Sequence, residues 1–122
     1  MAIMAPGLKT AKNQQSETSL TNAVRSMLKG IGYFHWKQWQ GPMSQPKGVS
    51  DILGILPDGR MFAIEMKRPG WTPPGPDTKA FRHHRNQQRF IDTINDNGGV
   101  AFFATSIDDV IAGLGIQDRF LF

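Results

Sequence analysis

The chain has 122 residues, of which 39% are hydrophobic and 20% charged, a balance typical of one globular domain and unlike that of a disordered or fibrous chain. It contains no cysteine, which excludes a disulfide framework, a thiol nucleophile and a zinc site built on thiolates. The net charge of +4 and the pI near 9.8 suit a polyanionic partner, although a solvated basic surface would give the same values.

The N-terminal segment, residues 1–15, is polar and has no periodicity, so we expect a flexible tail in front of a single domain over residues 16–122. This segment lacks the apolar core of a signal peptide, and no apolar run in the chain approaches the roughly 20 residues that span a bilayer. We therefore expect a cytoplasmic protein that has no membrane partner.

The first predicted element is an amphipathic helix over residues 16–29. Leu20, Val24 and Leu28 recur at helical spacing, and two glycines follow that would end the helix. The next segment, residues 33–40, is rich in aromatic residues and predicts a strand, after which glycines and prolines indicate a loop.

Two apolar segments, residues 51–56 and 61–67, predict the strands of a β-hairpin. The intervening residues 57–59, Pro-Asp-Gly, predict a type I turn that is closed by a glycine bulge. A turn of this length determines which residues of the two strands lie opposite each other.

The register of this hairpin predicts a metal site. Counting outward from a Leu56–Arg60 pair places Asp51 directly opposite Glu65, and Lys67 lies on the same face because side chains alternate along a strand. Two carboxylates whose β-carbons lie about 5 Å apart repel each other unless a proton or a cation lies between them. Divalent cations such as Mg²⁺ or Mn²⁺ prefer such oxygen ligands.

The second half of the chain completes an α/β pattern. A loop rich in proline and glycine, residues 68–80, precedes a second predicted helix over residues 83–97. Residues 100–105 are predicted to form a buried strand. Ser106 is predicted to cap a short helix that ends near Ala112. A right-handed strand–helix–strand crossover makes its two strands parallel, so we expect a mixed sheet flanked by helices.

Three further polar residues fit the same site. The Lys67 ammonium can stabilise the negative charge that develops on a phosphate under attack. Gln87 extends the apolar stripe of the second helix toward its N-terminus, and Glu17 does the same on the first helix. Both side chains are expected to meet metal-bound water or a phosphate, although Glu17 fits a helix-dipole role equally well.

Three stretches together resemble the VRR-NUC family of the PD-(D/E)XK nuclease superfamily: Gly48-Val-Ser-Asp51-Ile-Leu-Gly-Ile, Glu65-Met-Lys67-Arg-Pro-Gly70 and Gln87-Gln-Arg-Phe-Ile91. The resemblance covers about residues 17–105, and Ser50 stands where the motif has proline. It implies an α/β fold with a restriction-endonuclease-like core, in which helices flank a mixed central sheet.

The resemblance also implies roles for the site residues. It assigns four groups to the metal: Glu17, Asp51, Glu65 and the backbone carbonyl of Met66. Lys67 and Gln87 would then act on water and phosphate. Stand-alone members of this size resemble phage-encoded nucleases that dimerise like Holliday junction resolvases. The resemblance therefore implies a homodimeric endonuclease for branched DNA, in a bacterial or phage-infected cell.

Basic residues gather around the predicted site, where we expect them to bind the DNA backbone: Lys47, Arg68, Lys79, Arg82, Arg85 and Arg89. A solvated charged face is the alternative. Phosphate contact or plain exposure is expected of His83 and His84. Trp36 is expected to pack, whereas Trp71 stays open between packing and stacking on a base.

Two other functions remain open. A catalytically inert DNA-binding module would keep the basic residues and would bind DNA equally well in Mg²⁺ or EDTA. A ribonuclease would use the same site on RNA, because nothing in the sequence identifies a group that reads the 2′-hydroxyl.

Overall fold

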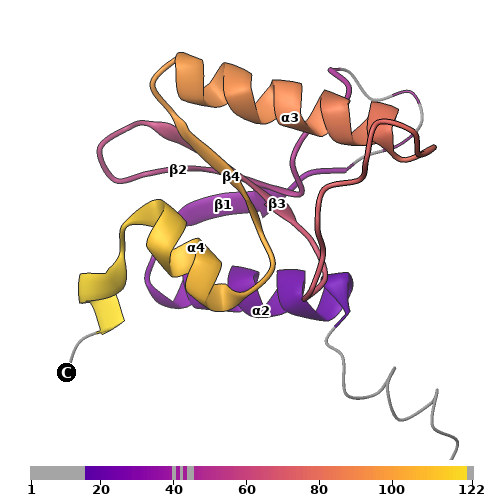
Figure 1. The fold of residues 1–122 in the computed structure, drawn as a ribbon. Coiled ribbons are helices and arrows are strands. Elements are labelled where there is room, and N and C mark those ends of the chain that lie inside the picture. Colours follow the sequence, from indigo (N-terminus) through magenta and orange to yellow (C-terminus); the bar gives the residue numbers. More distant parts are fainter. Residues whose placement is uncertain (1–15, 40, 42, 44–45, 121–122) are drawn as a thin grey trace, which may run out of the picture.

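The computed structural model of the chain describes residues 16–39, 41, 43 and 46–120, and the tail expected over residues 1–15 lies outside this part. The described elements follow one another as a helix, three strands, a helix, a strand, a helix and a short 3-10 helix (Figure 1). None of the described helices is long and apolar enough to cross a membrane.

The strands form one four-stranded sheet in the order β1-β2-β3-β4. Their bounds are Phe34–Lys37 for β1, Ile52–Ile55 for β2, Met61–Met66 for β3 and Val100–Ala104 for β4. Strand β2 is antiparallel to both β1 and β3, whereas β3 and β4 are parallel. The mixed sheet is therefore confirmed, because a helix crosses over between the two parallel strands as the element order predicts.

The turn between β2 and β3 has the predicted form. Leu56 N donates a hydrogen bond to Arg60 O, and Gly59 N donates one to Leu56 O, each at 2.8 Å. Gly59 has a φ of 93°, which glycine adopts without steric strain and which produces the bulge. The resulting register pairs Ile52 with Ile64, as the count along the sequence predicts.

The helices are α2 Glu17–Gly30, α3 Phe81–Asp96 and α4 Ile107–Leu114, followed by the 3-10 helix η1 Gln117–Phe120, which the sequence did not predict. Ser16 and Ser106 cap α2 and α4, each accepting a hydrogen bond at 3.0 Å from a backbone N–H three residues on. Helix α3 starts two residues earlier than predicted. Ala80 already has helical backbone angles, so the preceding loop turns directly into the helix without a side-chain cap.

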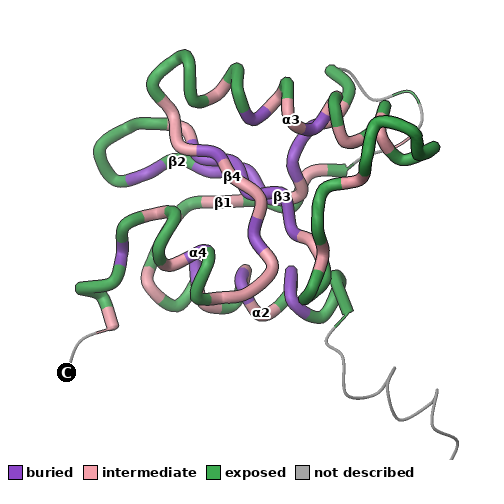
Figure 2. Tube along the Cα trace, viewed as in Figure 1, coloured by how far each residue is buried: buried purple, intermediate pink, exposed green. Residues whose placement is uncertain are grey.

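Helices cover both faces of the sheet, with α3 on one and α2 and α4 on the other (Figure 1). The side chains of β3 alternate between two cores. Phe62, Ile64 and Met66 pack with residues of α2 and α4, whereas Ala63 packs with Ile91 of α3. The buried segments accordingly run through the centre of the sheet (Figure 2). This alternation places the side chain of the next odd-numbered residue, Glu65, on the α3 face.

The loop before β2 lies against α3 at Gly48. A Cβ at this position would come within 2.3 Å of the backbone carbonyl of Asn86, and Gly48 has a φ of +75°. Only glycine allows so close an approach in this backbone conformation. The contact places the segment that leads to Asp51 beside the turn of α3 that carries Gln87.

Gly48→Ala is expected to lower the free energy of unfolding by about 3 kcal/mol or more, because a backbone clash adds to the strain of a positive φ. Gly59→Ala is the matched control, since Gly59 also has a positive φ but no atom lies within 4 Å of the added Cβ. A loss of about 1–2 kcal/mol is expected there. Urea unfolding followed by circular dichroism measures both variants. Equal losses would contradict the close contact at Gly48.

Candidate active site

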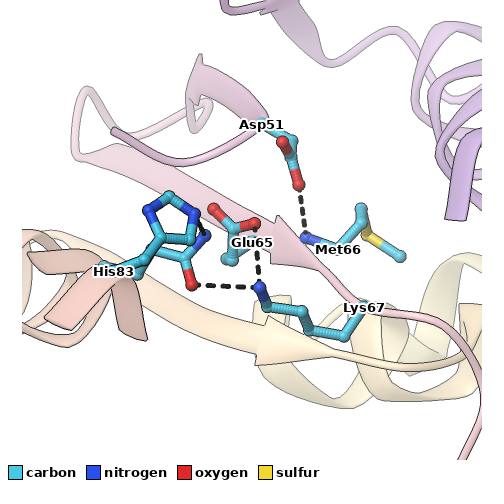
Figure 3. Close-up of polar contacts among 6 residues, drawn as sticks. Asp51, Glu65, Met66, Lys67 and His83 are labelled. Carbon is cyan, nitrogen blue, oxygen red and sulfur yellow. Dashed lines mark hydrogen bonds and ion pairs between the residues drawn. The ribbon is translucent and has the colours of Figure 1, made fainter. Parts of the chain in front are cut away.

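Three parts of the fold meet at one end of the sheet: the start of β2, the end of β3 and the first half of α3. Asp51 comes immediately before β2, Glu65 lies within β3, and Lys67 follows β3 (Figure 3). Gln87 reaches the same place from the buried side of α3. The structure therefore brings together the four residues that the sequence predicts to be catalytic.

Asp51 is tied to β3 by a hydrogen bond. Its Oδ2 accepts from the backbone N–H of Met66 at 2.9 Å, beyond the last pair of the β2–β3 register (Figure 3). Hydrogen bonds to charged acceptors contribute about 1.5–3 kcal/mol. The bond holds the Asp51 carboxylate near Glu65, as the hairpin register predicts. Sequence reasoning singled out only the carbonyl of Met66, and it missed this use of the N–H.

Glu65 is a buried acid next to a second acid. Its exposed fraction is 2%, and its Oε1 has no hydrogen-bond donor among the described residues. The pKa of Glu65 is raised to about 10, first by burial, then by the negative charge of Asp51 and a hydrogen bond with that side chain. Lys67 opposes this rise. A proton on Glu65 would make the hydrogen bond between the two acids possible.

This environment also fits a divalent cation. A cation would neutralise the two facing acids and satisfy the buried oxygen of Glu65, and hard ions bind carboxylate oxygens while keeping several waters. Within the described residues, no group of three or more acidic or imidazole side chains is placed to hold one ion. The protein side chains that fit are thus Asp51 and Glu65, with further oxygens from backbone or water.

Glu17 lies at the edge of this site rather than within the acid pair. A small pocket of about 90 Å³ is lined by Glu17, Thr18, Thr21, Asn22, Lys37 and Asp51. The negative charge of Glu17 contributes to the raised pKa of Glu65. Sequence reasoning did not consider Lys37. The feature that could have identified it is the pairing of β1 with β2, which places Lys37 opposite Ile52, the residue after Asp51.

Lys67 is held by two polar partners. Its Nζ donates to Gln87 Oε1 at 3.0 Å and lies 3.7 Å from Glu65 Oε2 (Figure 3). The lysine side chain is 13% exposed and Gln87 is 3% exposed. The ammonium is therefore held next to the acid pair, while part of the lysine side chain stays accessible.

Gln87 is itself oriented by a histidine. Gln87 Nε2 lies 3.2 Å from His83 Nε2, one helical turn earlier in α3 (Figure 3). Because Gln87 Oε1 accepts from Lys67, the amide nitrogen is left to donate to an unprotonated His83 Nε2. His83 therefore touches the site through Gln87, a contact that the sequence did not predict.

His84 and the tryptophans have different surroundings. His84 lies against Phe103 and Trp71, with ring centroids 5.3 and 5.7 Å away, and burial followed by the charges of Lys67 and His83 lowers its pKa. Trp36 was expected to pack, but it is 38% exposed and belongs to neither core; its ring meets Phe34 at 5.8 Å.

The predicted DNA-binding residues are all exposed, and three of them gather on α3. Arg82, Arg85 and Arg89 line a groove of about 390 Å³ together with Phe81 and Asn86. These arginines lie on the solvent side of α3, whereas Gln87 lies on its sheet side. The other three basic residues are on the loops: Lys47, Arg68 and Lys79.

The comparisons with known proteins bear on the fold. No family model and no curated protein sequence matches the chain. A solved structure described as a VRR_NUC domain matches it with a TM-score of 0.57 and 20% sequence identity, covering 86% of this chain and 97% of the other. At this identity the match shows a shared fold only. The roles of individual residues are inferred from the geometry described above. The chain has the α/β fold of a VRR_NUC domain, as its three sequence motifs predicted.

Proposed function

We propose that this protein is a metal-dependent nuclease that hydrolyses phosphodiester bonds in DNA. The observation that carries the proposal is the buried Glu65 carboxyl, which faces Asp51 and lies 3.7 Å from the Lys67 ammonium. The fold shared with a VRR_NUC domain supports the same reaction class. A purely structural role does not explain two adjacent acids and a cation that are held together in a largely buried place.

Mg²⁺ or Mn²⁺ would be held by Asp51 and Glu65 and by the carbonyl of Met66, a ligand that the sequence resemblance implies. The Glu17 carboxylate, at the edge of the site, would lie in the outer shell of the ion. When bound, such an ion supplies Lewis-acid stabilisation of the phosphate and a water of lowered pKa. The raised pKa of Glu65 supports this assignment, because a cation is the charge that would replace its proton.

Lys67, Gln87 and Asp51 would each have a separate role in the reaction. The Lys67 ammonium lies where it can stabilise negative charge on the phosphate oxygens and on the attacking water. Gln87 accepts a hydrogen bond from Lys67 and thereby sets the direction of the ammonium. Asp51 stays in place through Met66 N–H. Preorganised charges of this kind need no rearrangement during the reaction.

The position of the arginines supports a branched substrate. A strand cut beside Gln87 lies on the opposite side of α3 from the groove of Arg82, Arg85 and Arg89. A second DNA segment would be needed to occupy both places, as a junction or flap provides. We also propose a homodimer, because a two-fold axis lets two small domains cut paired strands.

Asp51→Asn and Glu65→Gln are expected to reduce cleavage of a DNA junction in Mg²⁺ below detection while leaving DNA binding nearly unchanged. Asn can still accept from Met66 N–H, so the first variant removes charge and keeps the bond. Lys67→Met is expected to lower kcat by about 10²–10³-fold. Asp108→Asn, in the first turn of α4, is the matched control.

Gel assays with junction, flap, duplex and single-stranded DNA and RNA, in Mg²⁺, Mn²⁺ or EDTA, measure these effects. Wild-type binding without cleavage in any of these ions would identify an inert DNA-binding module instead. Preferential cleavage of RNA would identify a ribonuclease. Normal cutting by the Asp51 or Glu65 variant would contradict the proposed site.

The buried acid also predicts a pH dependence in EDTA. Because the pKa of Glu65 is about 10 in the folded chain and 4.5 is its ordinary value, the folded state binds the extra proton between these values. The contribution of Glu65 to stability is therefore complete below about pH 4.5 and declines as the pH rises toward 10. Glu65→Gln is expected to remove this decline and to be the more stable protein at pH 8.

Unfolding by urea at pH 6 and pH 8, with and without Mg²⁺, measures this difference. Mg²⁺ is expected to stabilise the wild type and to leave Glu65→Gln nearly unchanged, because binding to the folded state alone raises stability. Equal stabilisation of both proteins would place the ion elsewhere.

Replacing Arg82, Arg85 and Arg89 together by Gln is expected to weaken junction binding and to reduce the slope of log K against log salt by about 3, since each lost phosphate contact contributes about 0.9. The triple variant should still cleave a short single strand of DNA when that substrate is saturating. Lys29, Arg60 and Arg119 replaced by Gln form the charge-matched control. Filter binding from 50 to 200 mM salt measures the slopes, and equal slopes for the two triple variants would rule out the arginine groove.

A further inference from the structure

The chain reverses direction immediately after Lys67. Trp71 N donates to Arg68 O at 3.1 Å, and Gly70 has a φ of 83°. Proline at the second position and glycine at the third are the signature of a type II turn, and Arg68-Pro69-Gly70-Trp71 has both. The turn returns the indole of Trp71 to Lys67, whose Nζ lies 5.3 Å from the ring centroid.

The indole is held by two other rings. Trp71 stacks on Phe103 of β4 with a centroid distance of 5.2 Å and an interplanar angle of 25°. His84 of α3 lies 5.7 Å from Trp71 and 5.3 Å from Phe103. Phe103 pairs with Glu65 in the parallel β3–β4 register, so the ring cluster stands beside the buried acid.

Lys67 needs such support because its side chain is long and flexible. Among the described residues its Nζ has one hydrogen bond, of 3.0 Å to Gln87, whereas the separation of 3.7 Å from Glu65 makes an ion pair but no hydrogen bond. An ammonium over an indole face is attracted by the ring quadrupole, and more strongly where water is largely excluded. Gln87 and Trp71 together restrict where the ammonium can lie.

We propose that Trp71 is a positioning residue that holds the Lys67 ammonium for the reaction, and that it is not a stacking platform for a nucleotide base. Phe103 stacks on the indole, and His84 and Lys67 contact it as well, so a base would have to compete with these contacts. The inference rests on the proposed nuclease function only through the role of Lys67.

Trp71→Leu is expected to lower kcat on a DNA junction by about tenfold, with KM changed by less than about twofold, because the substrate is still bound while the ammonium is displaced. Trp71→Phe keeps an aromatic face and is expected to retain most of kcat. Trp36→Leu is the matched control, an exposed tryptophan outside the site. A rise in KM with unchanged kcat would show base stacking and overturn the proposal, as would equal losses in the Leu and Phe variants.

A second measurement does not depend on cleavage. In the full chain with ¹³C-labelled lysine, the ε-methylene protons of Lys67 are expected to resonate upfield of the other lysines because of the indole ring current. Lys67→Arg identifies the signal, and Trp71→Leu should return it to the usual position. An unshifted Lys67 signal in the wild type would overturn the proposal even if the protein cuts DNA. A shifted signal in a protein that cuts nothing would support this contact while refuting the nuclease function.

Discussion

Glu65 is buried beside a second carboxylate, and this repulsion is the constraint to which the rest of the structure is fitted. Free side chains would move apart, but the hairpin register and the bond from Met66 N–H to Asp51 keep the two acids together. A buried charge costs several kcal/mol unless it is compensated. The pKa of Glu65 near 10 expresses that cost, and a proton or a cation relieves it.

The two cores make this arrangement possible because they hold β3 from both faces. A slip of the strand by one residue would move Glu65 into the apolar core beneath α2 and α4 and would move Ile64 out of it. The register is therefore enforced by Phe62, Ile64 and Met66 on one side and by α3 on the other. The two apolar cores, which contain many more residues than the site, thus keep an unfavourable pair of acids in place.

The cationic half of the site is assembled differently, from the crossover helix α3 and from the turn that follows β3. Gln87 and His83 come from α3, Trp71 comes from the loop before it, and all three converge on or near Lys67. The same helix carries its arginines on the opposite side, so α3 separates the proposed cleavage site from the proposed second DNA segment. In the proposed function, one helix would thereby serve both the chemistry and the substrate geometry.

The sequence alone determined the hairpin and the acid pair, because a short turn and the alternation of a strand are local rules that relate Asp51 to Glu65 by counting. It also determined the α/β class and the buried position of Gln87, through the periodicity of one helix. Only the tertiary structure decided that Gln87 meets Lys67, that Trp71 stacks on Phe103 and that Lys37 lies near Asp51. Those contacts join segments whose relative placement is set by packing across the sheet, which no spacing along the chain encodes.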